Sequence, residues 1–288
     1  MPSSISSRQI LRECVGQVSL PLLLSTPQLI THQRLFREDP DLSHILQDAF
    51  EVRNLSGQPE RYMLMPSGCM TLLFVLGPEP CARVCGALTT MRQLWLAAGA
   101  TLLCVRLQPG CGHWLLPSGV SVLTDHTAPL EQFLSGAGTL MARLLSCGSF
   151  EERTAVLLQL LRGLYNPSWE ASPLLSGCFS LIAASRGQSH VSYLALRSGC
   201  SERYLNRVFR ERVGISTKTM CELAQLQYSL YCILTTQPRS LLQTAVTFGY
   251  FDQAHMNRHY RKFLFCTAND MRSATNRTIP AAAIPFLY

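Results

Sequence analysis

Lysine is nearly missing from this sequence, and charged residues are few. Only Lys218 and Lys262 are lysines among 25 basic residues, and 15% of the 288 residues carry a charge, against about 25% in typical globular chains. Disorder requires low hydrophobicity and high charge, so a chain that is 47% apolar is not wholly disordered. No stretch reaches the ~18 apolar residues of a membrane span, and we expect no membrane partner. The length indicates two domains.

The signatures of common catalytic and cofactor sites are also missing. The sequence has no phosphate-binding loop, no GxGxxG after an expected strand, no HExxH and no GxSxG. Its 12 cysteines lie mostly in apolar runs, and the tightest pairings, Cys81 with Cys85 and Cys111 with His113, lack the doubled CxxC spacing of a zinc site. We therefore expect no catalysis, no cofactor and no metal, with buried thiols in a reducing, cytoplasmic compartment.

The positive charge is concentrated in the last third of the chain. From Arg186 onward there are 13 basic and 5 acidic residues, a net charge of +8, whereas the preceding residues carry a net charge of −1. A basic module joined to a nearly neutral one is typical of a polyanion-binding domain attached to something else.

Apolar periodicity divides the chain into regions. Apolar residues at helical spacing predict a helix over 41–50. Short apolar runs such as 71–76 and 101–107, bounded by glycine and proline, predict an antiparallel sheet or barrel. Helical spacing returns after Asp125, and the region 191–265 is expected to be all helix with short turns.

Two helix-turn-helix patterns lie in the basic region. In the first, Gly199 marks a tight turn and Ser201 is a good N-cap for a second helix. In that second helix, apolar residues share one face while arginine and asparagine occupy the other, as in DNA-binding helix-turn-helix units. The pattern recurs further along the chain: Ala195, Gly199 and Arg207 match Ala245, Gly249 and Arg258 at separations of 50, 50 and 51 residues.

A helix is expected to join the two units. The segment 218–234 has 17 residues, which span about 26 Å as a helix. With its flanking units it could place two recognition helices about 34 Å apart, the length of one DNA turn, in successive major grooves.

The region 186–272 resembles the DNA-binding domain of AraC/XylS-type transcription regulators. The residues that carry the resemblance are Leu194, Ala195, Gly199, Ser201, Leu205, Arg207, Phe209 and Gly214 in the first unit, and Ala245, Gly249, Tyr250, Asp252, Gln253, Asn257, Arg258, Tyr260, Arg261 and Lys262 in the second. The sequence departs from the family pattern where Phe265 and Ala268 replace its glycine and proline, and Gln225 replaces an arginine of the linker helix.

The N-terminal part more loosely resembles the small sensor domain found in some family members, over the stretches 64–74, 105–110 and 123–130. The resemblance implies an α+β chain, with a β-rich, cupin-like N-terminal domain before an all-α domain of two helix-turn-helix units joined by a linker helix. The expected divisions are an extension at 1–35, the sensor or dimerisation domain at 36–135, a helical connector at 136–185, the DNA-binding domain at 186–272 and a tail at 273–288.

Side-chain chemistry assigns candidate roles in DNA binding. Arginine can contact guanine with two hydrogen bonds, and asparagine or glutamine can contact adenine in the same way. The candidates for base contacts are Arg203, Asn206, Arg207, Gln253, Asn257 and Arg258. Those for phosphate contacts are Arg210, Lys218, Arg261 and Lys262.

In the N-terminal domain, Arg106, His113 and Trp114 are candidate ligand-binding residues near the expected mouth of the barrel.

The leading hypothesis is a bacterial, cytoplasmic regulator that binds double-stranded DNA, with the N-terminal domain as candidate controller. The resemblance implies transcription activation, RNA polymerase as a partner, and a homodimer and a small-molecule or protein effector as candidate partners. The alternative is a cytosolic protein whose cysteine-rich N-terminal domain senses a ligand or thiol chemistry. A cupin-type enzyme is disfavoured, because no catalytic cluster is visible.

Overall fold

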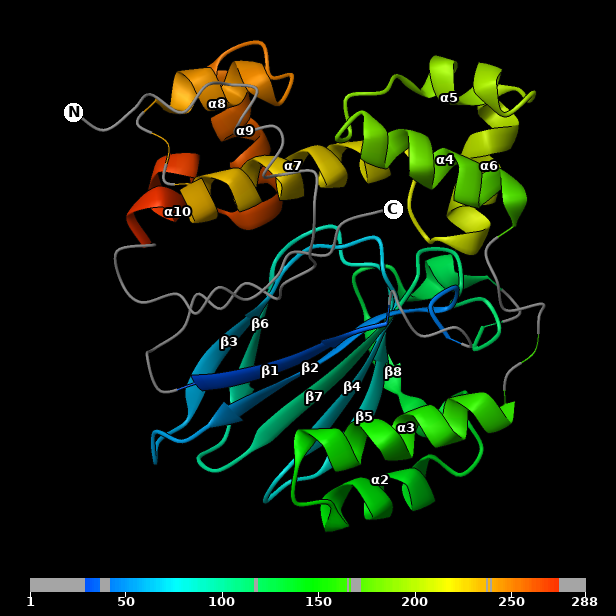
Figure 1. The fold of residues 1–288 in the computed structure, drawn as a ribbon, viewed down its shortest axis with the longest axis vertical. Coiled ribbons are helices and arrows are strands. Elements are labelled where there is room, and N and C mark those ends of the chain that lie inside the picture. The colour runs from blue at the N-terminus through cyan, green and yellow to red at the C-terminus, as the bar shows by residue number, and fades with distance from the viewer. Residues whose placement is uncertain are drawn as a thin grey trace.

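The computed structural model describes residues 29–36, 42–116, 119–164, 166, 172–236, 238 and 240–274. Strands form the N-terminal part of the described chain and helices the C-terminal part, which lies across one end of the sheets (Figure 1). This arrangement agrees with the predicted order of a β-rich region followed by an all-α region.

The larger sheet is antiparallel and has six strands in the order β1-β2-β7-β4-β5-β8, while β3 pairs with β6 in a second sheet. The short connection between β4 and β5 suits their antiparallel pairing, since parallel strands need long crossovers. The pairs β2–β7 and β4–β7 instead join strands that are distant in sequence. The strands are β1 (Leu29–Leu35), β2 (Leu46–Asn54), β3 (Glu60–Leu64), β4 (Thr71–Leu76), β5 (Cys81–Cys85), β6 (Arg92–Leu96), β7 (Thr101–Leu107) and β8 (Thr127–Pro129).

The helix predicted over 41–50 is wrong. Strand β2 begins at Leu46, after a turn in which the Leu46 N–H donates to the Leu42 carbonyl. Leu46 packs on one face of the sheet and Phe50 on the other. Because both faces of β2 are covered, its apolar residues do not alternate with polar ones. Their spacing therefore matched the periodicity expected of a helix.

Different elements cover the two faces of the larger sheet. Helices α2 (Ala137–Ser146) and α3 (Phe150–Leu164) pack on one face, and the β3–β6 sheet covers the other. The 3-10 turns η1 (Val120–Leu123) and η2 (Leu130–Gln132) flank β8. Arg153 of α3 reaches the sheet and donates to Glu51 at 2.7 Å, a buried ion pair that ties this helix to β2.

A second buried ion pair lies between the two sheets. Arg106 on β7 donates through Nε to Asp48 Oδ1 on β2 at 2.7 Å and through its NH2 group to the other carboxylate oxygen. Both side chains are almost fully buried, and the guanidinium lies over the Phe50 ring. The two contacts between guanidinium and carboxylate fix the pairing of β2 with β7 in this part of the N-terminal region, whose two packed sheets are called the barrel below.

The helical region packs around one long central helix, α7 (Thr217–Thr236). Helix α4 joins this core whereas α2 and α3 join the sheet, so the expected connector 136–185 is divided between the two parts. The remaining helices are α4 (Pro173–Ala184), α5 (Val191–Arg197), α6 (Glu202–Arg212), α8 (Leu241–Thr247), α9 (Gln253–Leu264) and α10 (Ala268–Ala274).

Three hydrogen bonds dock the N-terminal region onto the helices. Thr124 Oγ1 donates to the carbonyl of Gly214, just after α6, at 2.7 Å. Gln227 on α7 donates to the carbonyl of Pro66 at 2.8 Å. The N–H of Met91 donates to the carbonyl of Phe263, near the end of α9, at 2.8 Å. The barrel therefore contacts both helix-turn-helix units and the helix between them.

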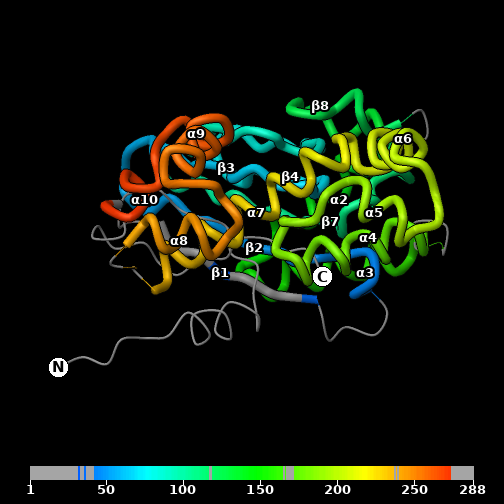
Figure 2. The backbone as a smooth tube through the Cα atoms, turned by 90° about the horizontal axis from the view of Figure 1, so that it is seen from above, coloured from blue at the N-terminus to red at the C-terminus, as the bar shows by residue number. Residues whose placement is uncertain are grey.

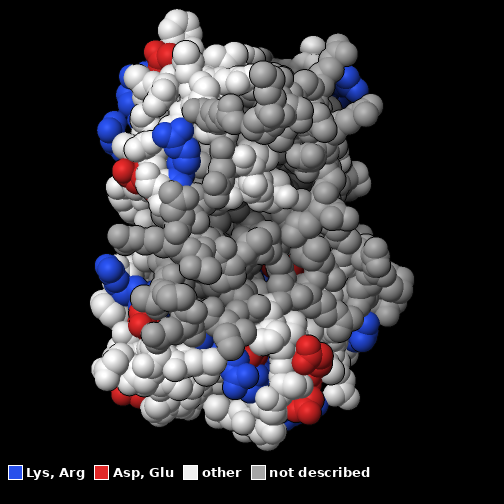
Figure 3. Space-filling view, turned by 60° about the vertical axis from the view of Figure 1, so that its left-hand side comes forward, with Lys and Arg blue, Asp and Glu red and all other residues white. Residues whose placement is uncertain are grey.

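The surface reflects the low charge of the sequence. On the face seen in Figure 3, the charged side chains of the described residues form a few small groups among uncharged ones. Of the helices within the described ranges, none combines the length and the apolar character that crossing a membrane requires.

Replacing Arg106 with Met is expected to lower the free energy of unfolding by about 3–5 kcal/mol, because Asp48 would remain buried without its partner. The double variant Asp48→Leu/Arg106→Met should recover much of that loss, because two buried apolar side chains need no charged or hydrogen-bonding partner. Denaturant unfolding of both single variants and the double variant measures the coupling, and additive losses would contradict it.

Candidate nucleic-acid interface

The two helix-turn-helix units are built alike. Helices α5 and α8 are related by 50 residues, while α6 and α9 begin 51 residues apart. Both turns contain a glycine in the left-handed region, Gly199 with φ +63° and Gly249 with φ +76°, a conformation that favours glycine. One residue separates Gly199 from the N-cap Ser201, but two separate Gly249 from the N-cap Asp252. The shift in register therefore lies in the second turn.

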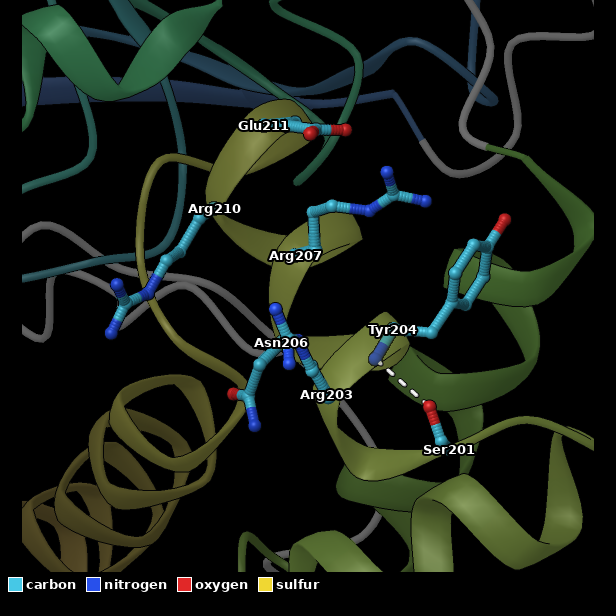
Figure 4. Close-up of a pocket in the computed structure, with 7 residues that line it drawn as sticks. All are labelled: Ser201, Arg203, Tyr204, Asn206, Arg207, Arg210 and Glu211. Carbon is cyan, nitrogen blue, oxygen red and sulfur yellow. Dashed lines mark hydrogen bonds between the residues drawn. The ribbon is translucent and has the colours of Figure 1, made fainter.

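Helix α6 presents three arginines to solvent. Its side chains Leu205 and Phe209 are fully buried, which turns Arg203, Arg207 and Arg210 outward (Figure 4). At helical spacing these three positions share one face. None of the three forms an ion pair with another residue in the described part of the chain.

Tyr204 adds an aromatic contact to this face. The Arg207 guanidinium lies over the Tyr204 ring at 5.1 Å from its centroid. This contact orients the arginine without using its N–H groups, which stay available as donors. The sequence left two roles open for Tyr204, beside the DNA backbone or in packing, and its place beside Arg207 follows from the i, i+3 spacing on one helix.

Asn206 is directed toward the next helix. Its Oδ1 accepts from the N–H of Thr217, the first residue of α7, at 3.2 Å, and its Nδ2 donates to the Glu202 carbonyl at 3.1 Å. The first N–H groups of a helix lack partners within the helix. Asn206 therefore supplies a hydrogen-bond acceptor for one of these N–H groups at the start of α7. This bond joins the recognition helix to the linker helix.

Helix α9 repeats this arrangement. Met256, Tyr260 and Phe263 are buried, while Arg258 and Arg261 are exposed. Gln253 is half-buried at the first turn of the helix.

Asn257 is the counterpart of Asn206, because its Oδ1 accepts from the N–H of Ala268, the first residue of α10, at 3.1 Å. The family pattern has proline where this chain has Ala268, and proline has no N–H to satisfy. Phe265, which replaces the pattern's glycine, adopts φ +59° in the left-handed region. The backbone therefore makes the turn without glycine.

The recognition helices lie on the same side of the molecule. Figure 2 shows α6 and α9 on one side of α7, near its opposite ends. The N-caps Ser201 and Asp252 begin the two helices, whose C-terminal ends both contact the barrel through Gly214 and Phe263. The N-terminal ends of both recognition helices therefore lie away from the N-terminal region.

The two lysines meet at one carboxylate. Glu222 on α7 lies 2.5 Å from the Nζ of Lys262 on α9 and 3.9 Å from the Nζ of Lys218. Sequence reasoning did not single out Glu222, although Lys218 and Glu222 have the i, i+4 spacing of a helical ion pair. The contact with Lys262 joins positions 40 residues apart, which helical spacing alone does not reveal.

A buried histidine lies beside this ion pair. His259 Nδ1 is hydrogen-bonded to the Tyr250 hydroxyl at 3.1 Å, and its Nε2 has no partner among the described residues. Burial lowers the pKa of His259 to about 4; Lys262 and His255 act in the same direction, and Glu222 opposes them.

The structure does not bring together the three candidate ligand residues of the N-terminal domain. Arg106 lies between the two sheets, paired with Asp48. Trp114 packs on the opposite face of the larger sheet, with the core under α2 and α3. His113 Nδ1 is hydrogen-bonded to the Gly110 carbonyl at 3.0 Å.

The buried thiols have little thiolate character. Burial raises the pKa of Cys69, Cys85 and Cys221 to about 12. Since the thiolate is the reactive form, these groups are poor nucleophiles and metal ligands. Within the described ranges, no three histidine, cysteine, aspartate or glutamate side chains gather as a metal site. These three thiols therefore give no support to the alternative of a thiol sensor.

Comparisons with known proteins agree with the two-part organisation. Residues 194–274 match the family described as "Helix-turn-helix domain", and residues 36–129 match a "Domain of unknown function" family. No curated protein is similar enough in sequence to count as a relative.

Solved structures that are similar include ToxT from Vibrio cholerae O395, with a TM-score of 0.43 and 6% identity, covering 87% of this chain and 99% of that chain. Another is unsaturated fatty acid bound wild-type ToxT from Vibrio cholerae strain SCE256, with a TM-score of 0.40 and 9% identity, covering 93% of this chain and 99% of that one. These TM-scores are too low to establish a shared fold.

Asn206→Ala and Asn257→Ala are each expected to lower the free energy of unfolding by about 1 kcal/mol, because an N–H at the start of the following helix loses its acceptor. The neighbouring exposed residues provide controls, since Arg203→Ala and Arg258→Ala should change stability by less than about 0.5 kcal/mol. Chemical denaturation compares the four variants. Asparagine variants as stable as the wild type would contradict this structural role.

His259 is expected to make the protein less stable in acid. Its pKa of about 4 in the folded state lies below the ordinary value of about 6.5, so between these values the unfolded chain binds the extra proton. Stability is therefore lost as the pH falls from 6.5 to 4, by about 2 kcal/mol from this residue. His259→Gln should flatten this part of the unfolding profile, whereas His190→Gln, at an exposed histidine, should leave it unchanged.

Proposed function

Because residues 194–274 form an AraC-type helix-turn-helix domain, we propose that this chain is a transcription regulator that binds specific sequences of double-stranded DNA. The observation that carries the proposal is the pair of recognition helices, which are both capped, both bear exposed arginines, and both lie on one side of α7. In this proposal α6 and α9 enter successive major grooves of one DNA duplex.

The geometry narrows the residues proposed to contact bases. Arg203 and Arg207 on α6, with Gln253 and Arg258 on α9, are the base-contacting set. Asn206 and Asn257 leave this set, because their carbonyl oxygens are hydrogen-bonded to the following helices. A bidentate contact to adenine needs both ends of the amide.

Phosphate contacts are assigned to Arg210, Arg261, Lys218 and Lys262. All four side chains are exposed on α6, α7 or α9. Contacts to phosphates position the protein on the duplex, whereas contacts to bases give it specificity.

The N-terminal region is proposed to control this activity through its docking on the helices. Its three hydrogen bonds reach the end of α6, the middle of α7 and the end of α9. An effector or a second copy of the chain that shifted the barrel would therefore act on both recognition helices. RNA polymerase is the proposed partner in transcription.

The test is selection of binding sites from a pool of random duplexes by the purified full-length chain, at two salt concentrations. A specific regulator enriches one motif, and its affinity falls steeply with salt because bound counterions are released. Failure to enrich any motif would overturn the proposal.

Arg207→Gln and Arg258→Gln are each expected to weaken binding to the enriched site by roughly 5- to 150-fold, the range of about 1–3 kcal/mol for a bidentate base contact. Each variant should also relax the preference at a different position of the motif. Arg143→Gln serves as the control, because it also removes one positive charge, at an exposed position on α2. An equal loss on all sequences would show that the arginine contacts phosphate instead.

A further inference from the structure

A groove lies between the two helix-turn-helix units. One wall comes from residues 187–191, which lead into the first turn of α5, and another from the second unit, including Gly249 and His255. Lys218, Glu222 and Gln225 of α7 form its floor. The groove therefore connects the two units that are proposed to enter neighbouring major grooves.

The floor of the groove faces away from the barrel. Met220 and Gln227 are the α7 residues that meet the N-terminal region, at Gly68 and Pro66. With 3.6 residues per turn, positions 218, 222 and 225 lie on the opposite side of the helix from 220 and 227. The charged groups of the groove are thus not covered by the barrel.

Glu222 joins recognition helix α9 to α7 through Lys262 and also pairs with Lys218 within α7. Lys262 belongs to α9, and its Nζ is 2.5 Å from Glu222. Lys218 follows Thr217, whose N–H is bound by Asn206 of α6, and it contacts the same carboxylate at 3.9 Å. Both lysines of this sequence therefore lie within 3.9 Å of the Glu222 carboxylate.

The chemistry of the two basic residue types differs. Arginine offers a planar fork that suits base edges, whereas lysine is a compact charge that suits phosphate but carries no sequence preference. A phosphodiester that approaches either lysine also approaches the negative charge of the Glu222 carboxylate, which weakens its attraction to the lysines. Glu222 therefore opposes the contacts that do not depend on sequence.

We propose that Glu222 is a specificity-determining residue, which keeps Lys218 and Lys262 from DNA backbone phosphates until the recognition helices are fully seated. This inference rests on the proposed function. In a loose, non-specific complex Glu222 retains both lysines. In the specific complex, the base contacts bring the DNA backbone close enough for its phosphates to bind Lys218 and Lys262 in place of Glu222.

The test compares Glu222→Gln with the wild type on two duplexes, the selected site and a scrambled sequence, over a range of salt concentrations. Glutamine keeps a hydrogen-bond acceptor for the lysines but removes the charge. The affinity for scrambled DNA should rise about tenfold at 0.1 M salt, and the slope of log affinity against log salt should steepen by about 0.9 for each additional phosphate that the variant neutralises. The affinity for the selected site should rise less, so the specificity ratio falls.

Two controls isolate the role of Glu222. Glu131→Gln makes the same change in net charge at an exposed position in the N-terminal region, and it should change the scrambled-sequence affinity much less. Adding Lys218→Gln and Lys262→Gln to Glu222→Gln should abolish the rise in affinity. Thermal unfolding of each variant checks that the fold is intact.

The outcomes separate the two proposals. A wild-type chain that enriches no motif contradicts the proposed function and this inference with it. An enriched motif, with Glu222→Gln binding scrambled DNA no more tightly than Glu131→Gln does, contradicts only the inference. Weaker binding with an unchanged salt slope also contradicts it, and identifies Glu222 as a residue that merely ties α9 to α7.

Discussion

The burial of helix α7 is the constraint on which the rest of the helical region depends. Its 20 residues span about 30 Å, close to the ~34 Å of one DNA turn. Its apolar residues contact both helix-turn-helix units within one core. Because interiors are closely packed, neither unit can rotate about α7 without opening that core. The distance between the recognition helices is thus set by the packing of both units on one helix, and not by a flexible linker.

Docking of the barrel adds a second constraint to the same helices. Gly68 lies so close to Met220 that an added Cβ would overlap the methionine sulfur. Next to Gly68 is Cys69, whose thiol donates to Gln47, in a core that also holds the Arg106–Asp48 pair. A continuous series of packed groups therefore leads from the inter-sheet core to α7. This contact adds to the hydrogen bonds at Gly214 and Phe263 by which the N-terminal region reaches the recognition helices.

The sequence predicted the repeated units well but not the direction of particular side chains. Helical spacing and the match of Gly199 with Gly249 were sufficient, because a turn and its two helices are local features. Asn206 and Glu222 depend on which neighbour packs against their helix, and that information comes from contacts distant in sequence. The strand at 46–54 was mistaken for a helix for a related reason, because covering both faces of β2 removes the alternation by which a strand is recognised.

The turn after α9 illustrates how a departure from a family pattern can be compensated. Phe265 holds a left-handed conformation at a cost of roughly 1 kcal/mol or more, and Ala268 exposes an N–H that proline would not have. Asn257 satisfies that N–H, and Asp270 accepts from both the N–H and the hydroxyl of Thr267. These contacts hold α10 against α9 without the usual glycine and proline. In the first unit, Gly214 with φ +94° makes the corresponding turn without strain, and Asn206 still binds the next helix. The asparagine contact is therefore common to both units. A side-chain bond across the start of the following helix is common to them as well, between Thr267 and Asp270 here and between Ser216 and Thr219 in the first unit.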